Sequence, residues 1–314
     1  MAERRKKKHI LLKIFLVLLL LLLAAAAGLA IYLYPAYRAS GYLAEHLNLG
    51  KADYTLEIRL DRGELSGKSR LLIDTLAEIT GITGEELCHL TIQGTVDEDI
   101  IYARIYSEGR EKPLTELYLS DGRDVVNGAM LYEAMRENFC SQNALLEYLF
   151  PVWEEHKYMS LKQAEDMFGV DLSVLRDFRL PLEKLRLSRL KCFGILALMH
   201  RDKGASGESF SLRMNGMDIA IHLQDPIECN LEAESPADAF NTLQKLGKKL
   251  SGAGIHLGMD GIDGDKLRIL ESLSVRLEMN EEDVTLRVPE DLISQNMVDI
   301  VKGIRVVIRE LSGK

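Results

Sequence analysis

SFSLRMNGMDIAIHL, residues Ser209–Leu223, is the stretch that decides the fold class. Apolar and polar residues alternate on both sides of Asn215-Gly216, and a period of two is typical of strands with one buried face. An Asn-Gly pair between two such runs is the strongest short signal for a β-hairpin, because both turn positions favour a positive φ. The stretch therefore predicts two adjacent antiparallel strands.

Further strand patterns lie on both sides of this hairpin. Several come as pairs separated by short polar turns, which predicts more antiparallel hairpins rather than parallel strands joined by long crossovers. The runs are Tyr54–Leu60, Leu90–Val96 with Ile100–Tyr106, Leu114–Leu119 with Val125–Asn127, Ile227–Ala233, and a last hairpin over Val275–Val288.

Helical patterns occupy the stretches between the strands. Ser160 and Gln163 form a capping-box pattern and Gly169 follows the last periodic residue, which predicts a short helix. Ser235 followed by Pro236 predicts another helix start. The other expected helices are Ser69–Ile79, Leu182–Met199 and Pro289–Leu311, the last with an apolar stripe at 293, 297, 300, 304, 308 and 311.

Hairpins with helices between them predict an α+β fold rather than a doubly wound parallel sheet. A curved antiparallel sheet that holds helices against its concave face would bury both kinds of element. This arrangement resembles, in architecture alone, the half-barrels of bacterial lipoprotein- and lipid-carrier proteins. The resemblance implies a curved half-barrel sheet packed on helices, whereas function has to be argued from a site.

The first 34 residues are typical of a membrane anchor. Five cations at 4–8 precede a run of 21 residues, Ile14 to Tyr34, that contains no charge. As a helix the run is about 31 Å long, close to the thickness of a bilayer's hydrocarbon core, and the cations predict a cytoplasmic N-terminus. We expect a basic cytoplasmic tail (1–13), a transmembrane signal-anchor (14–34), a stalk (35–52) that continues the helix part of the way, and an extracytoplasmic α+β domain (53–314), as one unit or two subdomains.

A cleaved signal peptide is the alternative for the same segment. Gly28-Leu29-Ala30 offers a small-x-small cleavage site, but signal-peptide cores are usually about 7–15 residues long. The length of the run therefore favours an uncleaved, single-pass protein of the cell membrane. No cysteine lies near the end of the run, which excludes an acylated lipoprotein and fits a bacterium with a single membrane.

The net charge changes sign at the end of the predicted anchor. Residues 1–34 carry six Lys/Arg and one acidic residue, net +5, so with −9 for the whole chain residues 35–314 carry −14. An acidic domain opposes binding to nucleic acid and to anionic surfaces. Solubility is the simplest reason for this charge.

Four cysteines, Cys88, Cys140, Cys192 and Cys229, form no C-x-x-C pair, which argues against zinc knuckles and redox dithiols. Outside the cytoplasm they allow three disulfide connectivities. Free buried thiols are an equal alternative, because Cys192 lies in a helical pattern and Cys229 in a strand pattern.

Three stretches resemble functional motifs and fail on spacing. In Leu60–Asp74, Gly63 stands four positions before Gly67-Lys68-Ser69, one short of a phosphate-binding loop, so we expect a strand-to-helix turn there. Ser188-x-x-Lys191 has no following K-[ST]-G. Gly258–Lys266 fits neither register of a calcium loop.

No catalytic, cofactor-binding or metal-ligating residue is predicted, and no cofactor. We expect a non-enzymatic, membrane-anchored protein of the bacterial cell envelope that binds a protein or a small apolar or lipid ligand. The alternatives are a cell-wall-acting envelope enzyme with dispersed catalytic residues and a structural or assembly protein. The sequence sets no oligomeric state.

Overall fold

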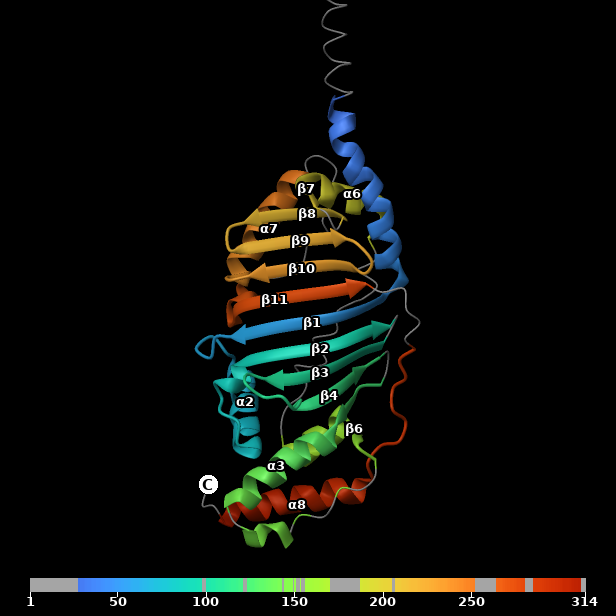
Figure 1. Cartoon of the computed structure of the whole chain (residues 1–314). Coiled ribbons are helices and arrows are strands. Elements are labelled where there is room, and N and C mark those ends of the chain that lie inside the picture. The colour runs from blue at the N-terminus through green and yellow to red at the C-terminus, as the bar shows by residue number, and fades with distance from the viewer. Residues whose placement is uncertain are drawn as a thin grey trace, which may run out of the picture.

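The computed structural model describes residues 28–97, 100–120, 123–142, 144–148, 150, 153, 156–169, 187–204, 207–251, 264–279 and 285–311. Within these ranges the chain is α+β, as predicted, and its strands form a single open antiparallel sheet of eleven strands (Figure 1). In spatial order the strands are β6 (Tyr158–Ser160), β5 (Val125–Asn127), β4 (Thr115–Leu119), β3 (Ile100–Ser107), β2 (His89–Asp97), β1 (Lys51–Leu60), β11 (Leu270–Met279), β10 (Ile227–Ala233), β9 (Met217–Leu223), β8 (Gly207–Met214) and β7 (His200–Gly204).

The first and last strands lie side by side in the middle of this sheet. β1 pairs with β11, and from this pair one meander runs outward through β2 to β6 while another runs through β10 to β7. The predicted hairpins β2–β3, β4–β5 and β8–β9 are confirmed, as is the pairing of β10 with β9. The strand direction rotates steadily from β7 to β6 in Figure 1, as expected of a twisted sheet.

The Asn215-Gly216 turn joins β8 to β9 with Met214 opposite Met217. Only Gly216 adopts a positive φ, 68°, so the expectation of two left-handed turn residues was wrong. A positive φ at the second central position alone is the requirement of a type II turn, which glycine satisfies without a Cβ clash.

The last predicted hairpin, Val275–Val288, was also wrong. β11 ends at Met279, and residues 285–290 form no strand. Both edges of β11 are already occupied, by β1 and by β10, so no hydrogen-bonding edge is left for a returning strand. Leu286 instead donates its backbone N–H to Asp97 Oδ2 (2.9 Å), at the end of β2.

Helices were predicted well where a cap marks the start. Ser160 and Gln163 form both hydrogen bonds of the capping box, and Gly169 ends that helix with φ 66°. Pro236 is the first residue of its helix, as expected. The helices are α2 (Gly67–Thr80), α3 (Gly128–Gln142), α4 (Leu161–Phe168), α6 (Arg189–Leu198), α7 (Pro236–Ser251) and α8 (Gln295–Leu311), with 3₁₀ turns η1 (Glu86–Cys88), η2 (Ala144–Tyr148) and η4 (Gly264–Ile269).

Two helix starts differ from the prediction. α6 begins only after Ser188, whose hydroxyl accepts from Lys191 N, and residues 182–186 lie outside the described part. α8 begins at Gln295 rather than Pro289, because the residues before it extend along the outer edge of β6. There Ile293 N donates to Tyr158 O at 2.8 Å.

The predicted apolar stripe is confirmed in part: Ile293 is buried, and Met297 and Ile304 pack against the same core. Val298 and Val301 are fully buried, whereas Ile300, part of the expected stripe, is 49% exposed. α8 contacts α4, and Val298 and Val301 extend the buried face beyond the predicted stripe.

Helices bury the two ends of one sheet face. At the end formed by β3 to β6, residues of α3, α4 and α8 close a core around Tyr132, Met135 and Phe168. At the other end, α6 and the N-terminal helix (28–49) pack on Phe210 and Ile221 of β8 and β9. Figure 1 shows α6 and the N-terminal helix beside the β7 end and α3 and α8 beside the β6 end.

The predicted membrane span, 14–34, lies outside the described residues except for 28–34, which are helical. Among the described helices, none combines the length and hydropathy needed to cross a bilayer. The predicted stalk, 35–52, is helical to residue 49 and then enters β1. Its Ala36, Ala39 and Leu43 are buried against α6 and the sheet, so this segment is part of the domain's core.

Candidate functional site

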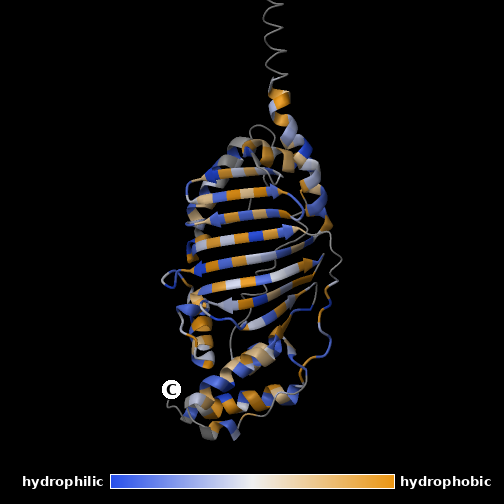
Figure 2. Cartoon of the chain, viewed as in Figure 1, coloured by the Kyte–Doolittle hydropathy of each residue, from blue (hydrophilic) through white to orange (hydrophobic). Residues whose placement is uncertain are grey.

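The two faces of the sheet differ in chemistry. Neighbouring residues along a strand point to opposite faces, and residues paired in register share a face. Figure 2 shows hydrophobic and hydrophilic residues alternating along most strands. Leu56, Ile58 and their register partners face the helices, whereas Thr55, Glu57 and their partners form the opposite face, over which no labelled helix lies in Figure 1.

An apolar row crosses seven strands on the helix-bearing face. The registers link each member to the next, and every member is a branched aliphatic residue. The row is Ile105, Ile92, Leu56, Val275, Leu231, Ile219 and Leu212, from β3 to β8. On the opposite face the neighbouring row is polar except for Ala220: Arg104, Gln93, Thr55, Arg276, Asn230, Ala220 and Ser211.

None of the seven apolar side chains in this row is fully buried; each is half-buried. The neighbouring row shows what full cover looks like: at its ends Val126, Leu117, Ile221 and Phe210 are at most 6% exposed. Between those ends, Tyr54 and Leu277 of the central strands are again half-buried. In these two rows the side chains near the sheet's ends are fully covered, whereas those of the central strands are covered only in part. Leu231 and Ile219 also pack on the cluster that includes Ala239 of α7.

Tyr54 spans the central strands of this face. Gly94 lies opposite it on β2, and the phenol hydroxyl donates to the carbonyl of Tyr102 on β3 at 3.1 Å. A Cβ on Gly94 would lie 1.9 Å from that carbonyl oxygen and 2.9 Å from the phenol oxygen, so only glycine fits. Burial raises the pKa of Tyr54 to about 12, which keeps the phenol neutral.

The opposite face carries a compact polar cluster around Glu116. Its Oε1 accepts from Tyr102 Oη (2.9 Å) and Arg104 Nε (3.2 Å). Its Oε2 accepts from Tyr158 Oη (3.0 Å) and Asn127 Nδ2 (3.1 Å). Both oxygens are thus occupied by the fold itself, which favours a structural role that ties β3, β4, β5 and β6 together.

The pKa values of this cluster agree with that role. Burial acts to raise the pKa of Glu116, but the hydrogen bonds from Asn127, Tyr102, Tyr158 and Arg104 outweigh it and leave the pKa lowered. Burial, and then the hydrogen bond to Glu116, raises the pKa of Tyr102 to about 12. A charged acceptor among neutral phenol donors is the stable arrangement at neutral pH.

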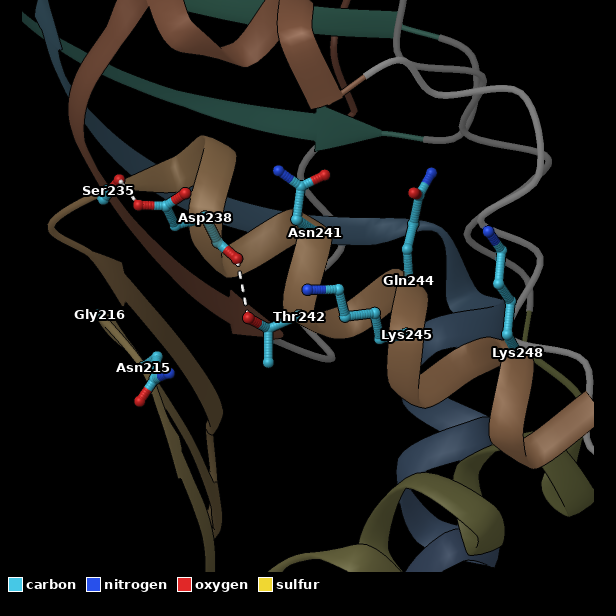
Figure 3. Close-up of a pocket in the computed structure, with 9 residues that line it drawn as sticks. All are labelled: Asn215, Gly216, Ser235, Asp238, Asn241, Thr242, Gln244, Lys245 and Lys248. Carbon is cyan, nitrogen blue, oxygen red and sulfur yellow. Dashed lines mark hydrogen bonds between the residues drawn. The ribbon is translucent and has the colours of Figure 1, made fainter.

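A polar pocket lies between α7 and the β8–β9 turn (Figure 3). It is open and encloses about 520 Å³. Within it Ser235 Oγ donates to Asp238 Oδ2 at 3.2 Å, and the Thr242 hydroxyl donates to the Asp238 carbonyl at 2.9 Å. Its lining consists of amides, hydroxyls, one carboxylate and two lysines: Asn215, Gly216, Ser235, Asp238, Asn241, Thr242, Gln244, Lys245 and Lys248.

The side chains that line this pocket offer little chemistry that could catalyse a reaction. Lys245 and Lys248 are both exposed; in Figure 3 Lys245 points back toward Thr242, whereas Lys248 and Gln244 point away from it. The Thr242 bond runs to the helix's own backbone, so that hydroxyl stabilises α7. The lining can hydrogen-bond a polar solute, but it lacks the apolar walls typical of tight small-molecule sites.

The sequence motifs resolve into structural roles where they are described. Ser66 caps α2, and Arg62 pairs with Asp74 at 2.7 Å, so Leu60–Asp74 is a strand-to-helix turn as expected. Ser188 caps α6. Most of Gly258–Lys266 lies outside the described residues. Elsewhere in the described chain no three His, Cys, Asp or Glu side chains gather as metal ligands.

All four cysteines are free thiols. Cys192 of α6 and Cys229 of β10 belong to the same apolar cluster. Burial, and then the nearby Cys192, raises the pKa of Cys229 to about 12, so this thiol is protonated and unreactive at neutral pH.

Comparison of the chain with protein-family models, with curated proteins and with solved structures finds no match. The candidate site therefore rests on the geometry of the sheet.

The apolar row was the feature that sequence reasoning missed. Alternation in Tyr54–Leu60 or Ser209–Leu223 shows that each strand has one apolar face. It does not show which strands are neighbours, and the row exists only because β1 pairs with β11. Incomplete cover of the row is likewise a property of where the helices pack.

Proposed function

We propose that the chain is a membrane-anchored, non-enzymatic binding module that holds the acyl chain of a lipid on the central apolar face of its sheet. The observation that carries this proposal is the half-buried row from Ile105 to Leu212. Covering these partly exposed aliphatic side chains with a further apolar group is favourable by about 25 cal/mol per Å² of apolar surface removed from water.

The length of the row suits such a ligand. Seven strands at about 4.8 Å spacing make a path of about 29 Å. The acyl chains of one leaflet extend about 15 Å, half of the hydrocarbon core. One or two acyl chains lying across the strands would therefore fit within the row. A sheet that curves around them as a half-barrel is the shape we propose for the bound state.

Membrane attachment supports a lipid as the ligand. Residues 28–34 form a helical end that stands clear of the domain, with Leu29, Ile31, Tyr32 and Tyr34 between 59% and 76% exposed. Large apolar side chains on every side of a helix are stable in lipid and unfavourable in water. We propose that this end continues the predicted span 14–34 in the cell membrane, with the domain on the extracytoplasmic side.

Photocrosslinking tests the proposal. The full-length chain is reconstituted in nanodiscs with a phospholipid that carries a diazirine in its acyl chain, and crosslinked peptides are located by mass spectrometry. Crosslinks are expected on peptides of β1 and β11 as well as on the span. Crosslinks confined to the span would refute lipid binding by the sheet.

A matched pair of variants identifies the face involved. Leu56→Gln with Val275→Gln alters the apolar row, and Thr55→Gln with Ser274→Gln alters the same two strands on the opposite face. Contact of one partly exposed aliphatic side chain with the ligand contributes about 1 kcal/mol, so the loss of two such contacts predicts about a 30-fold loss of crosslinking on the sheet. Equal crosslinking by the two variants would contradict the assignment of the face, provided that both keep the Trp153 emission of the folded chain.

A further inference from the structure

We infer that the first turn of α6 is a second membrane contact, which seats the domain on the lipid surface beside its own anchor. This inference rests on the proposed anchor and concerns a different surface from the apolar row. The contact surface consists of Arg189, Leu190 and Lys191 of α6 together with Tyr37 and Arg38 of the N-terminal helix.

The two helices are fixed to one another at this point. The guanidinium carbon of Arg189 lies 4.3 Å from the centre of the Tyr37 ring, and its Nη2 donates to Tyr37 O at 3.4 Å. Phe193, one turn further along α6, meets the same ring edge-on at 6.0 Å. Gly41 makes room, since a Cβ there would lie 3.3 Å from the guanidinium group.

The depth of Tyr37 and Arg189 relative to the bilayer follows from the helix geometry. If the span ends at Tyr34, Tyr37 lies three residues further on, about 4.5 Å along the helix axis. The headgroup layer on each side of a bilayer is about 5–7 Å thick. Tyr37 therefore lies within that layer, and Arg189, stacked on its ring, lies at the same level. The first turn of α6 cannot be far from lipid.

Side-chain chemistry at this level fits a membrane interface. Leu190, a large apolar residue that lies between two cations in the sequence, is 77% exposed. α6 carries Arg189 and Lys191 and no acidic residue, and residues 28–44 carry Arg38 and no acidic residue. Tyrosine and arginine are typical of the interface, and cations attract anionic headgroups.

This basic end stands out against the domain's overall charge. Residues 187–203 contain four Lys/Arg (Arg189, Lys191, Arg201, Lys203) and one acidic residue (Asp202), net +3, so the rest of 35–314, which totals −14, carries −17. Arg201 is paired with Glu208, whereas Arg189 and Lys191 of α6 are exposed beside the N-terminal helix. Repulsion between the acidic body and anionic lipid would keep the domain upright on this end.

Quenching of tryptophan fluorescence tests the contact. The full-length chain is reconstituted in nanodiscs of anionic phospholipid, with and without bromine on the acyl chains, and Trp153 provides a constant background at the far end of the domain. The variant Leu190→Trp is expected to lose most of its added emission in brominated lipid. The control Ile300→Trp, on the exposed face of α8, is expected to lose none.

A third variant separates this inference from the anchor. Leu20→Trp reports on the predicted span. Quenching at positions 20 and 190 but not at 300 supports the contact. Quenching at 20 alone would overturn the α6 contact and leave the anchor standing. Quenching at all three positions would overturn a specific seat, and quenching at none would overturn the anchor and the contact together.

Discussion

Glu116→Gln perturbs a carboxylate that accepts hydrogen bonds from four side chains of β3, β5 and β6. The side chain is 13% exposed, and each of its oxygens accepts from two donors. Glutamine keeps the shape but turns one oxygen into an NH₂ group. Arg104 can only donate, so we expect the remaining oxygen to face Arg104 and the NH₂ group to face Tyr158 and Asn127.

The size of the destabilisation depends on which hydrogen-bond donor to Glu116 loses its acceptor. The Tyr158 hydroxyl can rotate and accept from the new amide. The Asn127 amide is less free, because its Oδ1 accepts from Met130 N (3.4 Å), so its NH₂ group loses its acceptor. An unsatisfied buried donor costs about 1–3 kcal/mol, and we expect a loss of about 2 kcal/mol in the free energy of unfolding.

Denaturant unfolding of the full-length chain in detergent micelles, followed by Trp153 fluorescence, measures this loss. Glu57→Gln is the control, because Glu57 is exposed on the same face of the sheet and its substitution should change stability by less than about 0.5 kcal/mol. Equal stability of the two variants would refute the structural role of Glu116.

The pH dependence gives a second measurement with a definite sign. The pKa of Glu116 is lowered below its ordinary 4.5 in the folded chain, so the unfolded chain takes up a proton more readily. The stabilisation is complete above the unfolded pKa and is lost as the pH falls through the folded pKa. The gap between the parent protein and Glu116→Gln should therefore shrink below pH 4.5, and a gap independent of pH would contradict the reasoning.

Three further substitutions test the packing by the same unfolding assay. Gly94→Ala should cost about 3 kcal/mol, since its Cβ would lie 1.9 Å from the Tyr102 carbonyl oxygen, whereas Gly67→Ala, with open space around it, should not destabilise. Ser160→Ala removes the capping box of α4 and should cost about 1 kcal/mol; an unchanged midpoint would contradict that role. Val301→Ala should cost about 2 kcal/mol and Ile300→Ala under about 0.5 kcal/mol, and the reverse order would contradict the orientation of α8.

Local sequence patterns predicted the elements whose determinants are local. Ser160 with Gln163, Pro236 after Ser235, and Asn215-Gly216 each act within a few residues, and each marks the element where it was expected. The predictions that were wrong depended on distant partners. Val275–Val288 did not form a hairpin because β1 and β10 occupy both edges of β11.

α8 shows the same limit for a helix. Its apolar pattern from Pro289 is consistent with a longer helix, but the residues before Gln295 bond to Tyr158 at the outer edge of β6. These residues satisfy backbone groups at the outer edge of β6 that would otherwise be unpaired. The sequence of Pro289–Ser294 alone does not indicate that these residues lie next to the edge strand β6.

The central apolar face follows from the topology of the sheet. The outermost strands connect directly to helices: β5 leads into α3, β6 into α4, and α6 into β7. Because such connections are short, these helices pack near the sheet's two ends. β1 and β11 come from opposite ends of the chain and meet in the middle, where helix cover is least complete.

The N-terminal helix enters β1 directly, so the proposed anchor leads without a flexible linker to the strand that forms the centre of the proposed binding face. A ligand taken from the membrane would then meet that face at a fixed distance from the lipid. Inserting a flexible glycine-serine linker between residues 49 and 51 should therefore weaken crosslinking on β1 and β11 while leaving that on the span unchanged.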